Sequence, residues 1–239
     1  MLTGKKSYTQ KLRAIFGSSL IGLWSLDESS GTVAYDRSGN ARNGAYTAVT
    51  LANAKGPTKT CTMAPLFDGS TSFCNVYSAG FAGAFNGALG SVLLWGKVLN
   101  VGVWTDSTTR MLSRFMVDNN NYMDLRTTGA SGYLQYLRAG NNIADGGPYA
   151  TGSPTNWFQA VITWSETADE LKTFFNGTPA LATQATLGAW SGSLSATKVC
   201  LGAASTVPGN VWSGWLAHIA VLNRVATPAE VQSVYSWGL

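Results

Sequence analysis

The chain has 239 residues, of which 12% are charged, 11% are aromatic and 27 are glycine, a composition that excludes intrinsic disorder and favours a protein rich in sheets and turns. Its net charge of +4 equals the charge of residues 1–16, which carry Lys5, Lys6, Lys11 and Arg13 and no acid. The formally neutral remainder argues against a nucleic-acid partner, which would need a basic face, and no apolar run is long enough for membrane insertion.

Residues 1–17 are predicted to form a basic, amphipathic N-terminal arm. Ser7 and Gln10 fit a capping box, and Gly17 can end the helix that follows. Three residues share one helical face: Tyr8, Leu12 and Ile15. A helix of about three turns is marginal alone in water. The arm therefore needs either its own domain or a neighbouring molecule to hold it.

Short strands separated by turns are predicted from residue 18 onward. The strand-like segments are residues 20–26, 73–77, 89–98, 111–117, 122–126, 133–138, 157–164, 171–175, 199–201 and 214–222. Asn176-Gly177 suits a type I′ hairpin turn. Thr227 and Glu230 fit a second capping box, which opens a C-terminal helix. One all-β domain over residues 18–239 is predicted, an antiparallel β-sandwich or jelly roll with a short helix at each end.

Several segments resemble, in the same order, the landmarks of laminin-G-like jelly rolls in the concanavalin A-like lectin/glucanase superfamily. They are residues 22–28 (GLWSLDE), 36–44 (DRSGNARNG), 67–70 (FDGS), 157–177 with its central hairpin, and 215–231 with the last strand and its helix. The resemblance implies two packed antiparallel sheets. It implies diverse functions, namely glycan binding, adhesion and display on larger assemblies, and the fold does not select among them.

Calcium is the one cofactor that the resemblance implies. Many members of this family place an acidic calcium ligand in the last strand, where this chain has His218 and Ile219. Asp36 and Asp68 remain as candidate ligands, but calcium takes six to eight oxygens, and the lost carboxylate weakens the site. Both residues also fit turns in which they bond their own backbone, and the sequence favours that role.

No catalytic pattern is found in the sequence. A glycosidase needs two carboxylates on one face, and the four glutamates do not provide them: Glu28, Glu166, Glu170 and Glu230. A catalytic triad would have to use His218, the only histidine, which lies in a predicted strand without a nucleophile elbow in the chain. We therefore expect a protein that binds and is not an enzyme.

Aromatic residues in predicted loops are the candidate binding residues. Trp104, Trp190 and Trp212 lie among Gly, Ser, Thr and Asn, and Tyr149 is a further candidate. An exposed ring offers a flat apolar face on which a sugar can stack. The alternative, of equal weight, is that these rings cover the bases of loops or pack against a partner subunit.

The main functional hypothesis is a virion component, a surface or decoration protein of a tailed phage. The chain starts at Met1 without an export signal, and the arm would anchor it to other structural proteins or to copies of itself through Lys5, Lys6, Tyr8, Leu12 and Ile15. The alternative is a free or cell-surface, extracellular module that binds carbohydrate.

Overall fold

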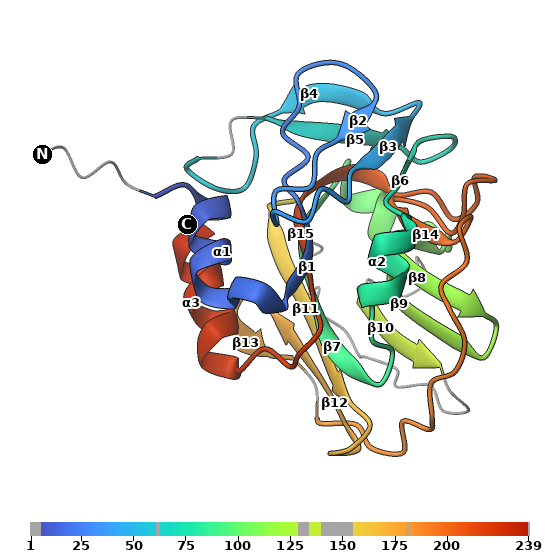
Figure 1. Cartoon of the computed structure of the whole chain (residues 1–239). Coiled ribbons are helices and arrows are strands. Elements are labelled where there is room, and N and C mark those ends of the chain that lie inside the picture. Colours follow the sequence, from blue (N-terminus) through green and yellow to red (C-terminus); the bar gives the residue numbers. More distant parts are fainter. Residues whose placement is uncertain (1–5, 61–62, 129–133, 140–154, 181, 239) are drawn as a thin grey trace, which may run out of the picture.

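The computed structural model describes residues 6–60, 63–128, 134–139, 155–180 and 182–238. It confirms the predicted all-β architecture, an antiparallel β-sandwich with a short helix near each end of the chain (Figure 1). In the described part of the chain, no helix is both long enough and apolar enough to cross a membrane.

The first sheet has eight strands and is called here the helix-covered sheet. Seven of them follow the order β13-β12-β11-β7-β15-β5-β4, and β1 also pairs with β15. Their bounds are β1 Leu20–Trp24, β4 Thr50–Ala54, β5 Ala64–Asp68, β7 Leu89–Val98, β11 Phe158–Ser165, β12 Glu170–Phe175, β13 Thr178–Pro179 and β15 Ser213–Leu222.

The second sheet has seven strands in the order β10-β9-β8-β14-β6-β3-β2. Their bounds are β2 Val33–Ala34, β3 Gly44–Thr47, β6 Phe73–Asn75, β8 Arg110–Asp118, β9 Asn121–Thr127, β10 Leu134–Ala139 and β14 Val199–Leu201. Cys74 of β6 and Val76, which follows this strand, enter the core between the sheets.

The helices are short, and α1 and α3 lie on the outer face of the helix-covered sheet. Their bounds are α1 Tyr8–Phe16, η1 Gly17–Ser19, α2 Ala79–Ala84, η2 Val101–Trp104 and α3 Pro228–Gly238. Both predicted capping boxes form, since Ser7 and Gln10 bond each other's amides at α1, and Thr227 and Glu230 do so before α3. The type I′ turn is confirmed by positive φ angles of 50° and 79° at Asn176 and Gly177.

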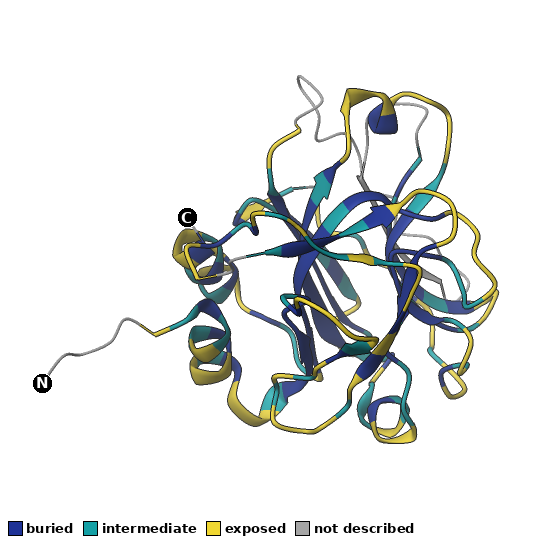
Figure 2. Cartoon of the chain, turned by 90° about the horizontal axis from the view of Figure 1, so that it is seen from above, coloured by how far each residue is buried: buried dark blue, intermediate teal, exposed yellow. Residues whose placement is uncertain are grey.

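Two apolar cores lie on opposite faces of the helix-covered sheet. One fills the space between the sheets, and the other lies between the outer face of the sheet and helices α1 and α3 (Figure 2). The second core gathers Tyr8, Leu12 and Phe16 from α1 with Trp95 from β7 and Val231 from α3. Helices α1 and α3, near the two ends of the chain, therefore cover the same face of the helix-covered sheet.

Packing of α1 on its own sheet corrects the prediction of an assembly arm. Tyr8 is 3% exposed and Leu12 is 1% exposed, while Ile15 is half-buried against the same core. These side chains cover the outer face of the helix-covered sheet and do not project toward a neighbouring molecule. Lys6 is exposed, and Lys5 lies outside the described residues.

Candidate functional site: a basic hollow between the terminal helices

Two of the predicted binding tryptophans are core residues. Trp104 and Trp212 are 1% and 0% exposed, and both rings pack near Phe158, with ring centroids 5.8 and 6.5 Å away. The polar sequence around them does mark loops, but these loops close one end of the sandwich. Of the two interpretations given equal weight, burial supports rings that cover the bases of loops and contradicts rings that are exposed for stacking.

Of the two remaining candidates, the structure describes Trp190 alone, and this ring is not openly exposed. Trp190 is half-buried, and its ring lies 5.8 Å from the ring of Phe85 at the edge of the core. Its backbone N–H donates to a carboxylate oxygen of Glu166. Tyr149 lies outside the described residues.

The two calcium candidates hold their own turns. The carboxylate of Asp36 accepts bonds from the amides of Leu23, Ser38 and Arg42. The carboxylate of Asp68 accepts bonds from the amides and hydroxyls of the turn that follows it, residues 70–72. Oxygens surrounded by N–H and O–H donors do not fit a calcium site, and the described residues hold no cluster of three metal-binding side chains.

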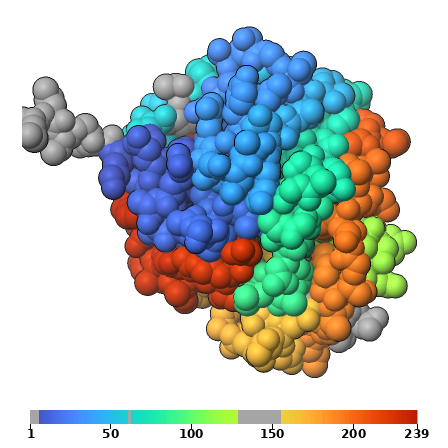
Figure 3. Space-filling model, in the orientation of Figure 1, coloured from blue at the N-terminus to red at the C-terminus, as the bar shows by residue number. Residues whose placement is uncertain are grey.

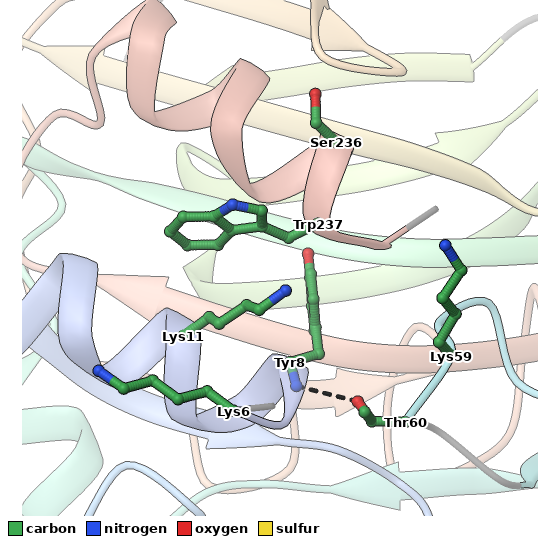
Figure 4. Close-up of a pocket in the computed structure, with 7 residues that line it drawn as sticks. All are labelled: Lys6, Tyr8, Lys11, Lys59, Thr60, Ser236 and Trp237. Atoms are coloured by element: carbon green, nitrogen blue, oxygen red, sulfur yellow. Dashed lines mark hydrogen bonds between the residues drawn. The ribbon is translucent and has the colours of Figure 1, made fainter. Parts of the chain in front are cut away.

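A hollow of about 320 Å³ lies where α1, α3 and the loop after β4 meet. Seven residues line it: Lys6, Tyr8, Lys11, Lys59, Thr60, Ser236 and Trp237. Figure 4 shows the ammonium of Lys11 beside Trp237, Lys59 on the other side of Tyr8, and Lys6 extending away from Lys59. Figure 3 shows α1 and α3 side by side on the surface.

Trp237 is the exposed aromatic wall of this hollow. It is 36% exposed, which makes it one of the few large apolar side chains that the described surface presents. Lys11 approaches its ring from α1, with Nζ 5.3 Å from the ring centroid. This cation–π contact joins the two terminal helices beside the hollow.

Tyr8 forms a rigid floor. Its hydroxyl accepts a bond of 3.0 Å from Trp95 Nε1 and lies 3.4 Å from Gln159 Nε2, both in the helix-covered sheet. Burial raises the pKa of Tyr8 above its ordinary value, so the ring stays neutral. Its backbone N–H donates to Thr60 Oγ1 at 2.9 Å, which ties the loop after β4 to the start of α1.

The charge of the hollow is positive and is not neutralised by side chains of the described residues. Lys6, Lys11 and Lys59 form no ion pair there, and no acid is among the lining residues. The described acidic side chains are engaged elsewhere, with arginine or lysine partners or with the backbone of turns.

Sequence reasoning missed most of this site, although one signal was available. Val231, Val234 and Tyr235 form the apolar stripe of α3, and Trp237 falls outside it. A tryptophan off the buried face of a helix must lie on the surface. Lys59 and Thr60 carry no such signal, because only the path of their loop brings them to α1.

Comparisons with known proteins identify the fold. No protein-family model matches the sequence, and no curated protein matches it. Among solved structures, domain 4 of AbnA, an extracellular GH43 arabinanase from Geobacillus stearothermophilus in complex with arabinotriose, matches with a TM-score of 0.62 and 17% identity. The match covers 91% of this chain and 98% of that domain.

Two longer proteins contain a similar sandwich. The sialidase of Trypanosoma rangeli in complex with the inhibitor DANA matches with a TM-score of 0.63 and 11% identity, over 90% of this chain and 32% of the sialidase. A mutant of HCR/D matches with a TM-score of 0.66 and 15% identity, over 93% of this chain and 52% of its own. These three likenesses support the β-sandwich fold of this chain.

The expectation that the chain is not an enzyme is contradicted. It rested on missing sequence patterns, whereas the solved structures that share the fold come from a glycoside hydrolase and from sialidases. At 10–17% identity the likeness concerns the fold alone, so no reaction is transferred to this chain. The missing patterns do not exclude catalysis in a sandwich of this type.

Proposed function

We propose that this chain is a carbohydrate-binding β-sandwich module that works outside the cell or at its surface. The observation that carries the proposal is the match, over nearly the whole of both chains, to an arabinanase domain in complex with arabinotriose. The proposed fold family is the laminin-G-like branch of the concanavalin A-like superfamily, to which the sequence landmarks point.

The basic hollow is the proposed carbohydrate site. The exposed ring of Trp237 offers an apolar face for a sugar ring, and hydroxyl and ammonium groups surround it for the polar edge of the sugar. Its volume of about 320 Å³ suits a small ligand, since such sites span about 300–1,000 Å³. An apolar face with a few convergent polar groups is the usual composition of a ligand site.

Calorimetric titration with a panel of neutral and acidic oligosaccharides, arabinotriose included, tests this proposal. We expect Trp237→Ala to weaken binding of every bound sugar at least about tenfold, because about 1.4 kcal/mol of stacking and apolar contact would be lost. Tyr35→Ala is the matched control. Tyr35 is 48% exposed and lies under a cation, with Arg37 Cζ 5.4 Å from its ring, but it is absent from the hollow.

Two results would overturn the proposal. One is a panel in which no carbohydrate binds the wild-type protein. The other is binding that Trp237→Ala leaves unchanged while its melting temperature shows that the variant is folded, because a sugar would then bind at another site.

A second and more specific hypothesis from the sequence is that the chain attaches to a virus particle. Its partners would then be other structural proteins or further copies of the chain. None of the three solved structures described above is a virion protein, and the apolar residues expected to anchor the chain pack on its own sheet. Density-gradient separation of material from the natural source tests it. Banding with particles at a fixed stoichiometry would support a virion role, and recovery in the soluble fraction would contradict it.

A further inference from the structure

We infer that the basic hollow binds an acidic carbohydrate, with the carboxylate or sulfate of the sugar held among Lys6, Lys11 and Lys59. This inference rests on the proposed function and deepens it by naming the chemical class of the ligand.

Charge is the first reason. Three ammonium groups line one hollow of about 320 Å³, and the described residues bring no carboxylate into it. Three lysines without a carboxylate partner among the lining residues give the hollow a positive potential, which favours an anionic ligand over a neutral one. The whole formal excess charge of the chain lies in residues 1–16, and α1 carries part of that charge to the edge of the hollow.

Hydrogen-bonding capacity is the second reason. Each lysine offers three donors and no acceptor, so the charged groups of the hollow can only donate. The Thr60 oxygen already accepts the Tyr8 N–H, and the Ser236 hydroxyl donates to the carbonyl oxygen of Gln232. A neutral sugar presents donors and acceptors in similar number. A carboxylate or sulfate presents acceptors alone, and charge-assisted bonds to it are roughly twice as strong as neutral ones.

The ring of Trp237 points to a sugar as the carrier of the anion. Lys11 Nζ lies 5.3 Å from the ring centroid, so an anion bonded to that ammonium would hold the attached ligand beside an exposed aromatic surface. Free phosphate or sulfate would leave this apolar surface unused. A sugar acid would use both parts of the hollow, with its charged group on the lysines and its ring on the tryptophan.

An extended polyanion fits the surface less well. Outside residues 1–16 the chain has 12 basic and 12 acidic residues, so this larger part has no excess of positive charge with which to follow a polyanion. Nucleic acids and anionic membranes present rows of phosphates that need a continuous basic stripe. A single sugar acid needs only a local cluster of positive charge.

Calorimetric titration with matched ligand pairs tests the inference. The pairs are sialyllactose with lactose, and a galacturonic acid trimer with its methyl ester, each measured at low and at high salt. We expect the acidic member to bind at least about tenfold more tightly than its neutral counterpart, and the preference to shrink as salt rises.

Lys11→Gln and Lys59→Gln separate the charge from the fold. Each variant keeps a polar side chain of only slightly shorter length and removes its charge. Each is expected to weaken binding of the acidic sugar about three- to tenfold while the neutral sugar changes less than twofold. Lys97→Gln is the matched control, because Lys97 Nζ also lies over a tryptophan, 5.0 Å from the ring centroid of Trp215, but outside the hollow.

Three outcomes overturn the inference, and they can be told apart. If neutral and acidic sugars bind equally through Trp237, the inference fails and the proposed function stands. If no carbohydrate binds, both fail. If vesicles containing phosphatidylserine, an oligonucleotide or inorganic phosphate bind through the lysines and the acidic sugars do not, the hollow recognises phosphate and the inference fails.

Discussion

His218 occupies an unusual position for a histidine. It is 3% exposed, lies in the irregular register of β15 between Ala217 and Ala220, and has a positive φ of 50°. Its Nε2 lies 3.3 Å from Thr58 Oγ1, and its ring lies 4.7 Å from the ring of Tyr8. Burial lowers the pKa of His218 from 6.5 to about 3, so the imidazole stays neutral beneath α1 and the loop after β4.

Replacement of His218 by Asn should make the free energy of unfolding depend less on pH below pH 7. Between pH 6.5 and about 3 the unfolded chain takes up a proton that the folded chain refuses, so the free energy of unfolding falls as the pH falls. Between pH 7 and pH 5 we expect the wild-type protein to lose about 2 kcal/mol more than the variant. Urea denaturation at several pH values measures this difference, and parallel profiles would contradict it.

Arg114 and Asp124 form a buried ion pair on the second sheet. Arg114 Nε and Nη2 donate to the two oxygens of Asp124 at 2.8 and 2.6 Å, across directly paired positions of β8 and β9. The Asp124 side chain is 0% exposed, and burial raises its pKa. The neighbours Phe115, Met123 and Leu125 lie in the core between the sheets, so alternation along the strands places the ion pair on the outer face.

Loss of one partner should be far costlier than loss of both. Arg114→Met leaves a buried carboxylate without its partner, and we expect it to lower the free energy of unfolding by about 3–5 kcal/mol. The double variant Arg114→Met with Asp124→Leu removes both charges and should recover most of that loss. Urea denaturation of the wild type, the two single variants and the double variant measures this double-mutant cycle. Additive effects of the two substitutions would contradict a coupled pair.

At the scale of elements, helix α1 attaches the N-terminal part of the chain to the helix-covered sheet. Leu12 is 1% exposed in the core beneath α1 and α3, whereas Arg13, the next residue, is exposed. We expect Leu12→Ala to lower the free energy of unfolding by about 2–5 kcal/mol and Arg13→Ala to change it by about 0.5 kcal/mol or less. Equal effects in thermal unfolding would show that α1 is not docked on the sheet.

At the scale of the whole molecule, the two terminal helices close one face of the sandwich. Deletion of residues 1–16 would uncover Trp95 and remove the Tyr8 hydroxyl that its Nε1 bonds. We expect the truncated protein to melt about 10–20 °C lower, or to be insoluble. An unchanged melting temperature, followed by tryptophan fluorescence, would contradict this and restore the interpretation of residues 1–16 as a free arm.

Most elements were predictable from the sequence, because their signals are local. The Asn176-Gly177 turn and the two capping boxes each depend on neighbouring residues, and each appears as expected. Helix α2 was missed, since its Gly- and Ala-rich sequence has weak helix signals beyond the cap at Ser78. Exposure was less predictable, as Trp104 and Trp212 demonstrate: a loop can close a core as well as face solvent.

By itself, the sequence determined the class of fold and the placement of charge. Strand periodicity, turn residues and caps act over a few positions, so they specify a sandwich with terminal helices, and residues 1–16 carry the excess positive charge. Only the tertiary structure decided where that charge acts. Lys11, Lys59 and Trp237 are far apart in the chain, and they meet because α1 and α3 must both bury their apolar faces on the same side of one sheet.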